Sequence, residues 1–183
     1  MKFTVNDLVS YRTSGVCRIA EIKNCDFGGK QREYYILHPI HDEKSVIFVP
    51  VDSPLSDKMN RLLTKDEANK IIASSIPEKP FDWIENDRER TAKIKEIASS
   101  GDRERITRMI KTLRLRRKAL SACGKKLRVT DEAALVSAEK VLYDEFAYAL
   151  GIERGDVISY IETKIAEAEK SEAEAQADAE AAE

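Results

Sequence analysis

The residues of this chain that could do chemistry are basic and aromatic, and they gather in its middle. Between residues 103 and 128 there are eleven lysines and arginines and a single acid, Glu104. Upstream of this run stands the only tryptophan, Trp83. Because the whole chain carries a formal net charge of −2, the local positive excess is not a by-product of composition. Such concentrated charge indicates a polyanion or an acidic protein as its partner.

The basic run has a simpler alternative, which is a solvated helix face. Such faces usually alternate in sign, so that residues four apart can pair, and this run hardly alternates. We therefore expect it to contact the phosphate backbone of nucleic acid, with an acidic protein as the next possibility. The basic residues expected to make this contact are Arg114, Arg116, Arg117, Lys118, Lys125 and Lys126.

Trp83 also allows two interpretations. A lone tryptophan beside Phe81 and Ile84 is commonly a packing residue of a core or a domain interface. An aromatic side chain can instead act as a wedge that inserts at a base step and partly unstacks it. The nearby Pro80 stiffens the connector, which favours the wedge, because such a segment can present a side chain without burying it.

Residues typical of enzymes and metal sites are sparse. His38 and His41 flank a proline and lack a matching set of ligands, so we predict no metal and no acid–base role for them. Cys17, Cys25 and Cys123 are odd in number and without CxxC spacing, so we expect reduced thiols, buried or half-buried. No phosphate-loop or nucleophile-elbow motif is present. The sequence predicts a protein that is not an enzyme and needs no cofactor.

The N-terminal part alternates apolar and polar residues over short stretches that are separated by turn residues. These stretches are rich in β-branched and aromatic residues, which is typical of strands. We predict four strands that form a small, strongly bent antiparallel β-barrel. They cover residues 8–11, 16–22, 33–37 and 45–50.

After a linker at 52–57 the apolar spacing becomes helical. Thr64 and Glu67 have the spacing of a capping box, and Asp102 can cap the basic helix. The helices are expected at 65–75, 86–99, 103–123, 131–150 and from about 154 onward. The fold class is therefore α+β, with a small N-terminal antiparallel β-barrel followed by an all-helical C-terminal domain.

This pattern divides the chain into residues 1–52, residues 53–170 and an acidic Ala/Glu tail at 171–183. The tail contains little to bury, so we expect disorder or a frayed helix there. No apolar run has the length of a signal peptide or a membrane span. We expect a cytoplasmic monomer with no membrane contact.

Several motifs, taken in order, resemble one protein family over residues 3–165. They are Phe3-x-Val5-x-Asp7-x-Val9-x-Tyr11-x-x-x-Gly15-Val16, Glu33-Tyr34-Tyr35-x-Leu37, Val49-Pro50, the Trp83 connector, Ser100-Gly101-Asp102 and Glu139-x-x-Leu142-x-x-Glu145-Phe146-Ala147. Together they are similar to the CarD/CdnL family of bacterial transcription regulators. The resemblance implies a Tudor-like (SH3-like) first domain, shared with transcription-repair coupling factors, that binds the RNA polymerase β subunit.

The resemblance also implies roles for particular residues. Trp83 matches the family's wedge in the DNA minor groove at the upstream edge of the melted promoter. Arg88, Arg90 and Lys93 follow it as candidate DNA-binding residues, and which of them faces the phosphates stays open. Where relatives can carry basic residues at the polymerase contact, this chain has Cys25 and Phe48. With the neighbouring Lys23 and Lys44 they are the expected polymerase-binding residues.

The sequence thus predicts a transcription regulator that binds polymerase and promoter DNA and stabilises the open complex. Sequence specificity should be low, since contacts to phosphates carry no base information. The alternative is a non-enzymatic assembly or scaffold protein whose basic helical face binds RNA or an acidic protein.

Overall fold

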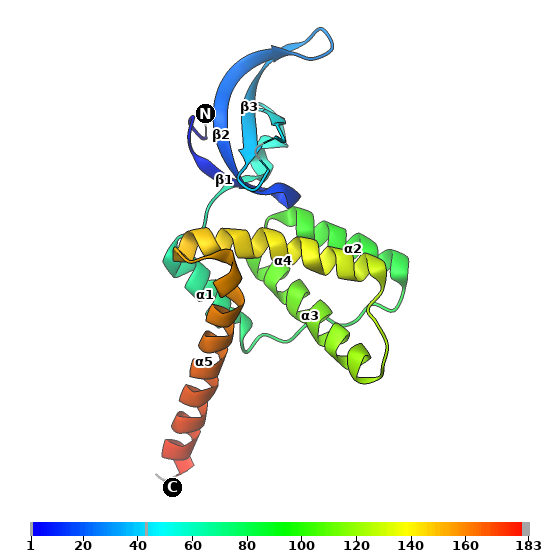
Figure 1. Cartoon of the computed structure of the whole chain (residues 1–183), viewed down its shortest axis with the longest axis vertical. Helices are drawn as coiled ribbons and strands as arrows, with labels where there is room; N and C mark the ends of the chain where they lie inside the picture. The colour runs from blue at the N-terminus through cyan, green and yellow to red at the C-terminus, as the bar shows by residue number, and fades with distance from the viewer. Residues whose placement is uncertain (1, 43, 181–183) are drawn as a thin grey trace.

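The computed structural model describes residues 2–42 and 44–180, and it places an antiparallel sheet above a group of helices (Figure 1). The strands are β1 (Leu8–Tyr11), β2 (Gly15–Asp26), β3 (Gln31–Pro39), β4 (Ile47–Pro50) and β5 (Met59–Arg61). The helices are α1 (Lys65–Ser75), α2 (Asp87–Ser100), α3 (Arg103–Ala122), α4 (Val129–Leu150) and α5 (Val157–Glu180). Short 3-10 turns lie at Arg12–Ser14, Ser56–Lys58 and Arg154–Asp156. The predicted α+β class is confirmed.

The sheet is open, whereas the sequence predicted a small β-barrel. Its strand order is β4-β3-β2-β1-β5, so β4 and β5 form the two edges. β2 is the longest strand, and a register shift between Ile19 and Glu21 interrupts its ladder with β3. Such a bulge bends a strand without closing the sheet. β5 was not predicted, and it pairs with β1 beyond the expected domain boundary at residue 52.

The side chains on one face of the sheet form a hydrophobic core. Val9, Cys17, Ile19 and Leu37 are fully buried there, as the alternation of the strands requires. Burial raises the pKa of the Cys17 thiol to about 12, so it stays protonated at neutral pH. Cys25 is half-buried but Cys123 is exposed. The expectation of three buried or half-buried cysteines is therefore wrong for Cys123, which follows the last turn of α3.

The helix ends follow the predicted caps. Thr64 and Glu67 form a complete capping box at the start of α1. The Asp102 carboxylate accepts a hydrogen bond from the backbone N–H of Arg105 at 3.0 Å. Gly101 ends α2 in the left-handed conformation, and a Cβ there would lie 2.9 Å from the Asn60 side chain on β5. The left-handed backbone thus favours glycine here, and a larger residue would also displace the Asn60 side chain.

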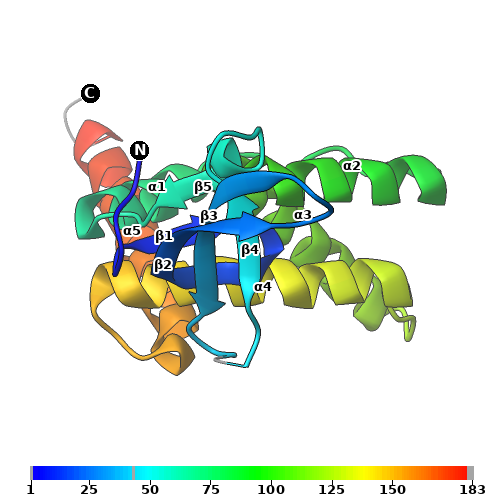
Figure 2. The same ribbon diagram turned by 90° about the horizontal axis from the view of Figure 1, so that it is seen from above.

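A second hydrophobic core lies among the helices. The helical spacing of the sequence predicts one apolar stripe on α3, formed by Ile106, Met109, Ile110, Leu113 and Leu120. The first four are buried and pack with α1 and α4, whereas Leu120 is half-buried. Seen from above, the sheet lies over α2 and α4 (Figure 2). Two separate cores fit two domains, although the predicted division at residues 52 and 170 stays a prediction.

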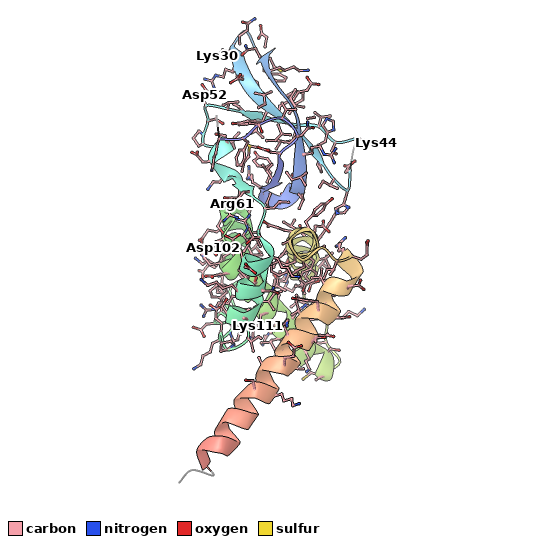
Figure 3. All side chains as sticks on the ribbon, turned by 90° about the vertical axis from the view of Figure 1, so that its left-hand side faces the viewer. Lys30, Lys44, Asp52, Arg61, Asp102 and Lys111 are labelled. Atoms are coloured by element: carbon pink, nitrogen blue, oxygen red, sulfur yellow. The ribbon has the colours of Figure 1, made fainter. Side chains whose placement is uncertain are left out.

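Buried polar groups join the sheet to the helices. Glu145 of α4 is 2 % exposed, and it accepts hydrogen bonds from Arg103 at 2.8 Å and from the backbone N–H of Leu63 at 3.3 Å. Arg103 also donates to the carbonyl of Arg61 at 3.2 Å. Figure 3 shows Arg61 at the level where the sheet meets the helices. On the other side of the junction, His41 Nε2 lies 3.4 Å from Asp144 Oδ1.

α5 projects away from the rest of the molecule (Figure 1). It continues to Glu180, so most of the predicted tail is helical here, and residues 181–183 lie outside the described residues. Among the helices that the structure describes, none combines the length and apolar character needed to cross a bilayer.

Candidate functional site

The connector between α1 and α2 is fastened to α3 upstream of Trp83. The backbone N–H of Phe81 donates to Thr112 Oγ1 at 2.9 Å. The guanidinium of Arg108 lies 4.2 Å from the centre of the Phe81 ring. Lys111 Nζ donates to the carbonyls of Ser75, Ile76 and Glu78 at 2.7–2.9 Å, which satisfies the C-terminal end of α1. Basic residues of α3 therefore set the path of this connector.

Trp83 is partly buried against the helical core. Two guanidinium groups lie over its ring, that of Arg90 at 4.6 Å from the ring centre and that of Arg116 at 4.8 Å. Both distances are within the range of a cation–π interaction. Trp83 is thus held by packing and by charge, and part of its side chain remains open to solvent.

Arg90 is buried, with 5 % of its surface exposed. Its guanidinium donates to Asp131 Oδ2 at 2.9–3.1 Å and to the carbonyls of Ile84 and Glu85 at 2.7 and 3.2 Å. Asp131 is itself 1 % exposed. Because these bonds use the donors of Arg90 internally, the structure does not present this predicted DNA-binding residue to a phosphate.

Most of the basic residues of α3 are paired with acids from other elements. Arg114 pairs with Glu139, Arg117 with Glu132 at 2.9 Å, and Arg105 with Glu96 at 2.9 Å. Lys93 of α2 likewise pairs with Glu96, at 2.7 Å, and these two partners lower the pKa of the Glu96 carboxyl. The charge run that looked unpaired along the sequence is therefore largely neutralised in space.

Four of the predicted DNA-binding residues keep free charges. Within the described part of the chain, Arg88, Lys118, Lys125 and Lys126 are exposed, and their side chains have no hydrogen-bond or ion-pair partner. They belong to the start of α2, the end of α3 and the α3–α4 loop, which lie at the same end of the helical group in Figure 1. Arg128 pairs with Asp87, which joins this loop to α2.

The residues predicted to bind polymerase lie mainly on the outer face of the sheet. Lys23 is opposite Tyr34 in the ladder, and Phe48 is opposite Ile36, so these side chains share the face away from the core. Cys25 lies two residues beyond Lys23 on the same face. Lys23 pairs with Glu21 at 2.7 Å, and this hydrogen bond raises the Lys23 pKa.

Lys44 is separate from this face. It is an exposed residue of the β3–β4 connection, and Figure 3 shows it at the side of the sheet. The structure therefore brings together Lys23, Cys25 and Phe48 but leaves Lys44 apart.

Phe27 and Tyr34, which the sequence analysis did not identify as site residues, lie beside Phe48 on the outer face. Phe27 and Phe48 are 52 % and 41 % exposed, and their ring centres are 5.3 Å apart. Tyr34 lies 5.1 Å from Phe27 and 6.4 Å from Phe48. We call Phe27, Tyr34 and Phe48 the aromatic cluster. The sequence held one sign of this cluster. Tyr35 is buried, so the alternation of the strand places its neighbour Tyr34, an aromatic residue, on the outer face where polar residues are expected.

A comparison with known families gives the N-terminal part of the chain an identity. Residues 3–62 match the family model described as the CarD-like/TRCF RID domain. The chain begins with a CarD-like/TRCF RID domain. This match confirms the family resemblance in the N-terminal third of the molecule, and it ends just after β5, so it covers the whole five-stranded sheet. No curated protein matches the chain.

Proposed function

We propose that this protein is a transcription regulator that binds the RNA polymerase β subunit and promoter DNA and stabilises the open complex. The observation that carries this proposal is that one chain contains both a domain of a polymerase-binding type and a helical part with features suited to DNA. A CarD-like/TRCF RID domain is joined to helices that hold a single tryptophan between two arginines and that also carry four unpaired basic side chains. The first part would supply the polymerase contact and the second the DNA contact.

The aromatic cluster is the proposed centre of the polymerase contact. Exposed aromatic patches are uncommon on surfaces that remain in water, and aromatic residues often anchor interfaces. Phe48 lies on β4, which is an edge strand with one free side. A partner can therefore add a strand at β4 while covering the cluster beside it. Lys23 and Cys25 lie on the same face, and Lys44 would act only as a nearby charge.

Binding of the isolated β subunit tests this contact. Phe48→Ala in the full chain should raise the dissociation constant about tenfold or more, the loss typical of an interface anchor. The matched control is Tyr148→Ala, because Tyr148 is 44 % exposed but lies on α4. Equal affinities for the two variants would place the polymerase contact elsewhere.

At the DNA, the proposed mechanism is selective binding to one state of the promoter. The indole of Trp83 would stack on bases that are unstacked at the edge of the bubble, and the closed duplex does not offer this surface. A ligand that binds only the melted state shifts the equilibrium towards it. The free charges of Arg88, Lys118, Lys125 and Lys126 would bind phosphates in both states, which provides affinity without sequence preference.

The decisive experiment measures Trp83→Ala in two ways on one preparation. Because Trp83 is only partly buried, its loss should lower the free energy of unfolding by less than the ~3–5 kcal/mol of a fully buried aromatic residue. The half-life of the polymerase open complex should fall about tenfold, since stacking on a base is worth ~1–3 kcal/mol. A large stability loss with an unchanged half-life would remove the wedge from the mechanism.

One surface favours the alternative of an assembly protein with an acidic partner. Val129 and Val136 are 85 % and 56 % exposed on α4, and Lys125, Lys126 and Lys140 lie around the same shallow surface. Apolar area with a basic rim suits an acidic amphipathic segment as well as DNA. Recovery of polymerase β with the protein after nuclease treatment supports the first proposal, and recovery of an acidic protein without polymerase supports the second.

A further inference from the structure

The connector that carries Trp83 is held firmly on both sides of this residue. Upstream, Phe81 is bonded through its backbone to Thr112 and lies under the guanidinium of Arg108. Downstream, the carbonyls of Ile84 and Glu85 accept hydrogen bonds from the buried Arg90. The backbone of Trp83 is therefore fixed by its neighbours, and the direction of its side chain is a separate matter.

Packing alone does not fix the indole. A cavity of about 170 Å³ lies beside it, lined by Phe81, Ile94, Ile97 and Met109 among others. A ring with empty space on one side loses the contacts that would stop its rotation. Other groups are needed to keep Trp83 in one orientation.

The two guanidinium groups over the ring meet this need in different ways. Arg90 is immobile, because Asp131 and two carbonyls hold it inside the protein. Arg116 is less constrained, since its side chain is 38 % exposed and its nearest acid, Glu85, is 4.0 Å away. In the described part of the chain, Nε of Arg116 is buried without a hydrogen-bond partner. The ring of Trp83 is thus the main contact that orders Arg116, and Arg116 in turn covers the ring.

We propose that Arg90 and Arg116 are positioning residues for Trp83, not phosphate ligands. Arg90 fixes the backbone on which the indole stands, and Arg116 holds the ring in the orientation in which its free part faces solvent. This role rests on the proposed function in one respect, which is that the melted promoter would bind the oriented indole of Trp83. It changes the role of two residues that the sequence alone assigned to DNA.

The test uses the fact that Trp83 is the only tryptophan, so that fluorescence excited at a wavelength that tyrosine does not absorb reports on this residue alone. Arg116→Gln removes the guanidinium from the ring. The matched control, Lys118→Gln, removes the same charge from the same helix at an exposed position that lies over no aromatic ring of the described residues. Arg116 is chosen because an Arg90 variant would leave Asp131 buried without its partner and so could fail to fold.

Acrylamide quenching of the free protein should separate the two variants. A cation–π contact at a half-exposed site is worth ~0.5–1 kcal/mol, so its loss should raise the population of displaced rings about 2- to 5-fold. We expect the quenching constant and the emission maximum to change in Arg116→Gln and to stay at parental values in Lys118→Gln. Identical quenching of the parent and both variants would overturn the proposal.

Open-complex half-life then distinguishes this proposal from the function on which it rests. Both variants lose one positive charge, so a half-life that falls further in Arg116→Gln than in Lys118→Gln supports an oriented indole in the complex. If the quenching changes while the two half-lives fall equally, Arg116 positions Trp83 but Trp83 does not act at the promoter. That outcome would keep the positioning role and reject the wedge.

Discussion

Trp83 shows how one side chain can pack against a core and still remain accessible to a binding partner. Its contact with the helical core and its two guanidinium neighbours limit its motion, and it is not among the buried residues. The sequence offered packing and presentation as alternatives. The structure combines them, because an aromatic residue that is ordered before binding loses less conformational entropy when it binds.

The buried pair of Arg90 and Asp131 should matter for stability. Arg90→Met leaves the Asp131 carboxylate and two backbone carbonyls without their partner, so the free energy of unfolding should fall by ~3–5 kcal/mol. Chemical denaturation of the variant measures this loss. Arg88→Met is the control, because Arg88 is exposed and its substitution should change stability by less than ~0.5 kcal/mol. Similar losses for both would mean that the pair contributes nothing particular.

Arg90 also marks what a sequence can and cannot reveal about single residues. The position of Trp83 on a connector was predictable from the prolines around it. The burial of Arg90 was not, because it depends on Asp131, which belongs to a different helix and is brought near only by the fold. An arginine in a basic segment has the same sequence signal whether it faces a phosphate or a buried carboxylate.

At the scale of elements, α3 is the clearest example of the same limit. Its apolar stripe predicted the buried face correctly, since helical spacing is a local property. Its charges were predicted to be unpaired because only one acid stands nearby in sequence. Glu132 and Glu139 of α4 and Glu96 of α2 neutralise much of this charge, and tertiary contacts of this kind have no local signal.

The sheet shows a second limit of prediction from sequence, which concerns short polar strands. Its first four strands were visible because alternation and turn residues mark them. β5, with the sequence Met59-Asn60-Arg61, is too short and too polar to show alternation, and its place beside β1 is decided by pairing over a long distance. The predicted β-barrel is wrong for this sheet, in which β4 and β5 are separate edges.

The capping box of α1 predicts a dependence of stability on pH. The Arg61 side chain, and then the backbone of Thr64, lower the pKa of the Glu67 carboxyl from 4.5 to about 2. Because the folded pKa is the lower one, the stabilisation is complete above pH 4.5 and is lost as the pH falls towards 2.

The variant Glu67→Gln keeps the shape of the side chain but cannot titrate. Its melting temperature should lie below that of the parent at neutral pH, and the difference should shrink towards pH 2. A difference that stays constant over this range would contradict the assignment.

At the scale of the molecule, charge is separated between two ends. The start of α2, the end of α3 and the α3–α4 loop lie at one end of the helical group, and α5 extends away from it (Figure 1). The first three segments carry the free basic residues Arg88, Lys118, Lys125 and Lys126, and the last part of α5 has the acidic sequence. Little of the total positive charge is therefore available to DNA, and we expect a smaller number of phosphate contacts than the composition of α3 suggests.

Salt dependence of duplex binding measures that number. With about four phosphate contacts, the logarithm of the binding constant should fall against the logarithm of salt concentration with a slope of about −3 to −4. Replacing Lys125 and Lys126 by Gln should make the slope shallower by about 2. The control replaces Lys30 and Lys58, two exposed lysines of the N-terminal part, and should leave the slope unchanged. A parental slope near zero would exclude DNA as the partner.

The junction between the sheet and the helices decides whether the two proposed contacts can act together. Glu145 and Arg103 connect α4 and α3 to the backbone of Arg61, the last residue of β5, and of Leu63 just after it. If the sheet is bound to polymerase, this fixed connection holds Trp83 at a defined distance from the docking surface. The second contact then forms as an intramolecular step, and its effective concentration depends on how rigid the connection is.

Replacing both members of this buried pair tests the coupling without leaving a lone charge. The double variant Arg103→Met, Glu145→Leu keeps the side-chain volume but loses the bonds to Arg61 and Leu63. Affinity for the isolated β subunit and for duplex DNA should each stay near the parental value, because neither surface is altered. The open-complex half-life should fall about tenfold, as part of the ~100-fold or larger gain that a well-matched linkage provides.

The control is Lys164→Met, Glu167→Leu, which removes an exposed pair on α5. A parental half-life in the junction variant would show that the two parts act independently, because a loose connection would then stabilise the open complex as well as a fixed one.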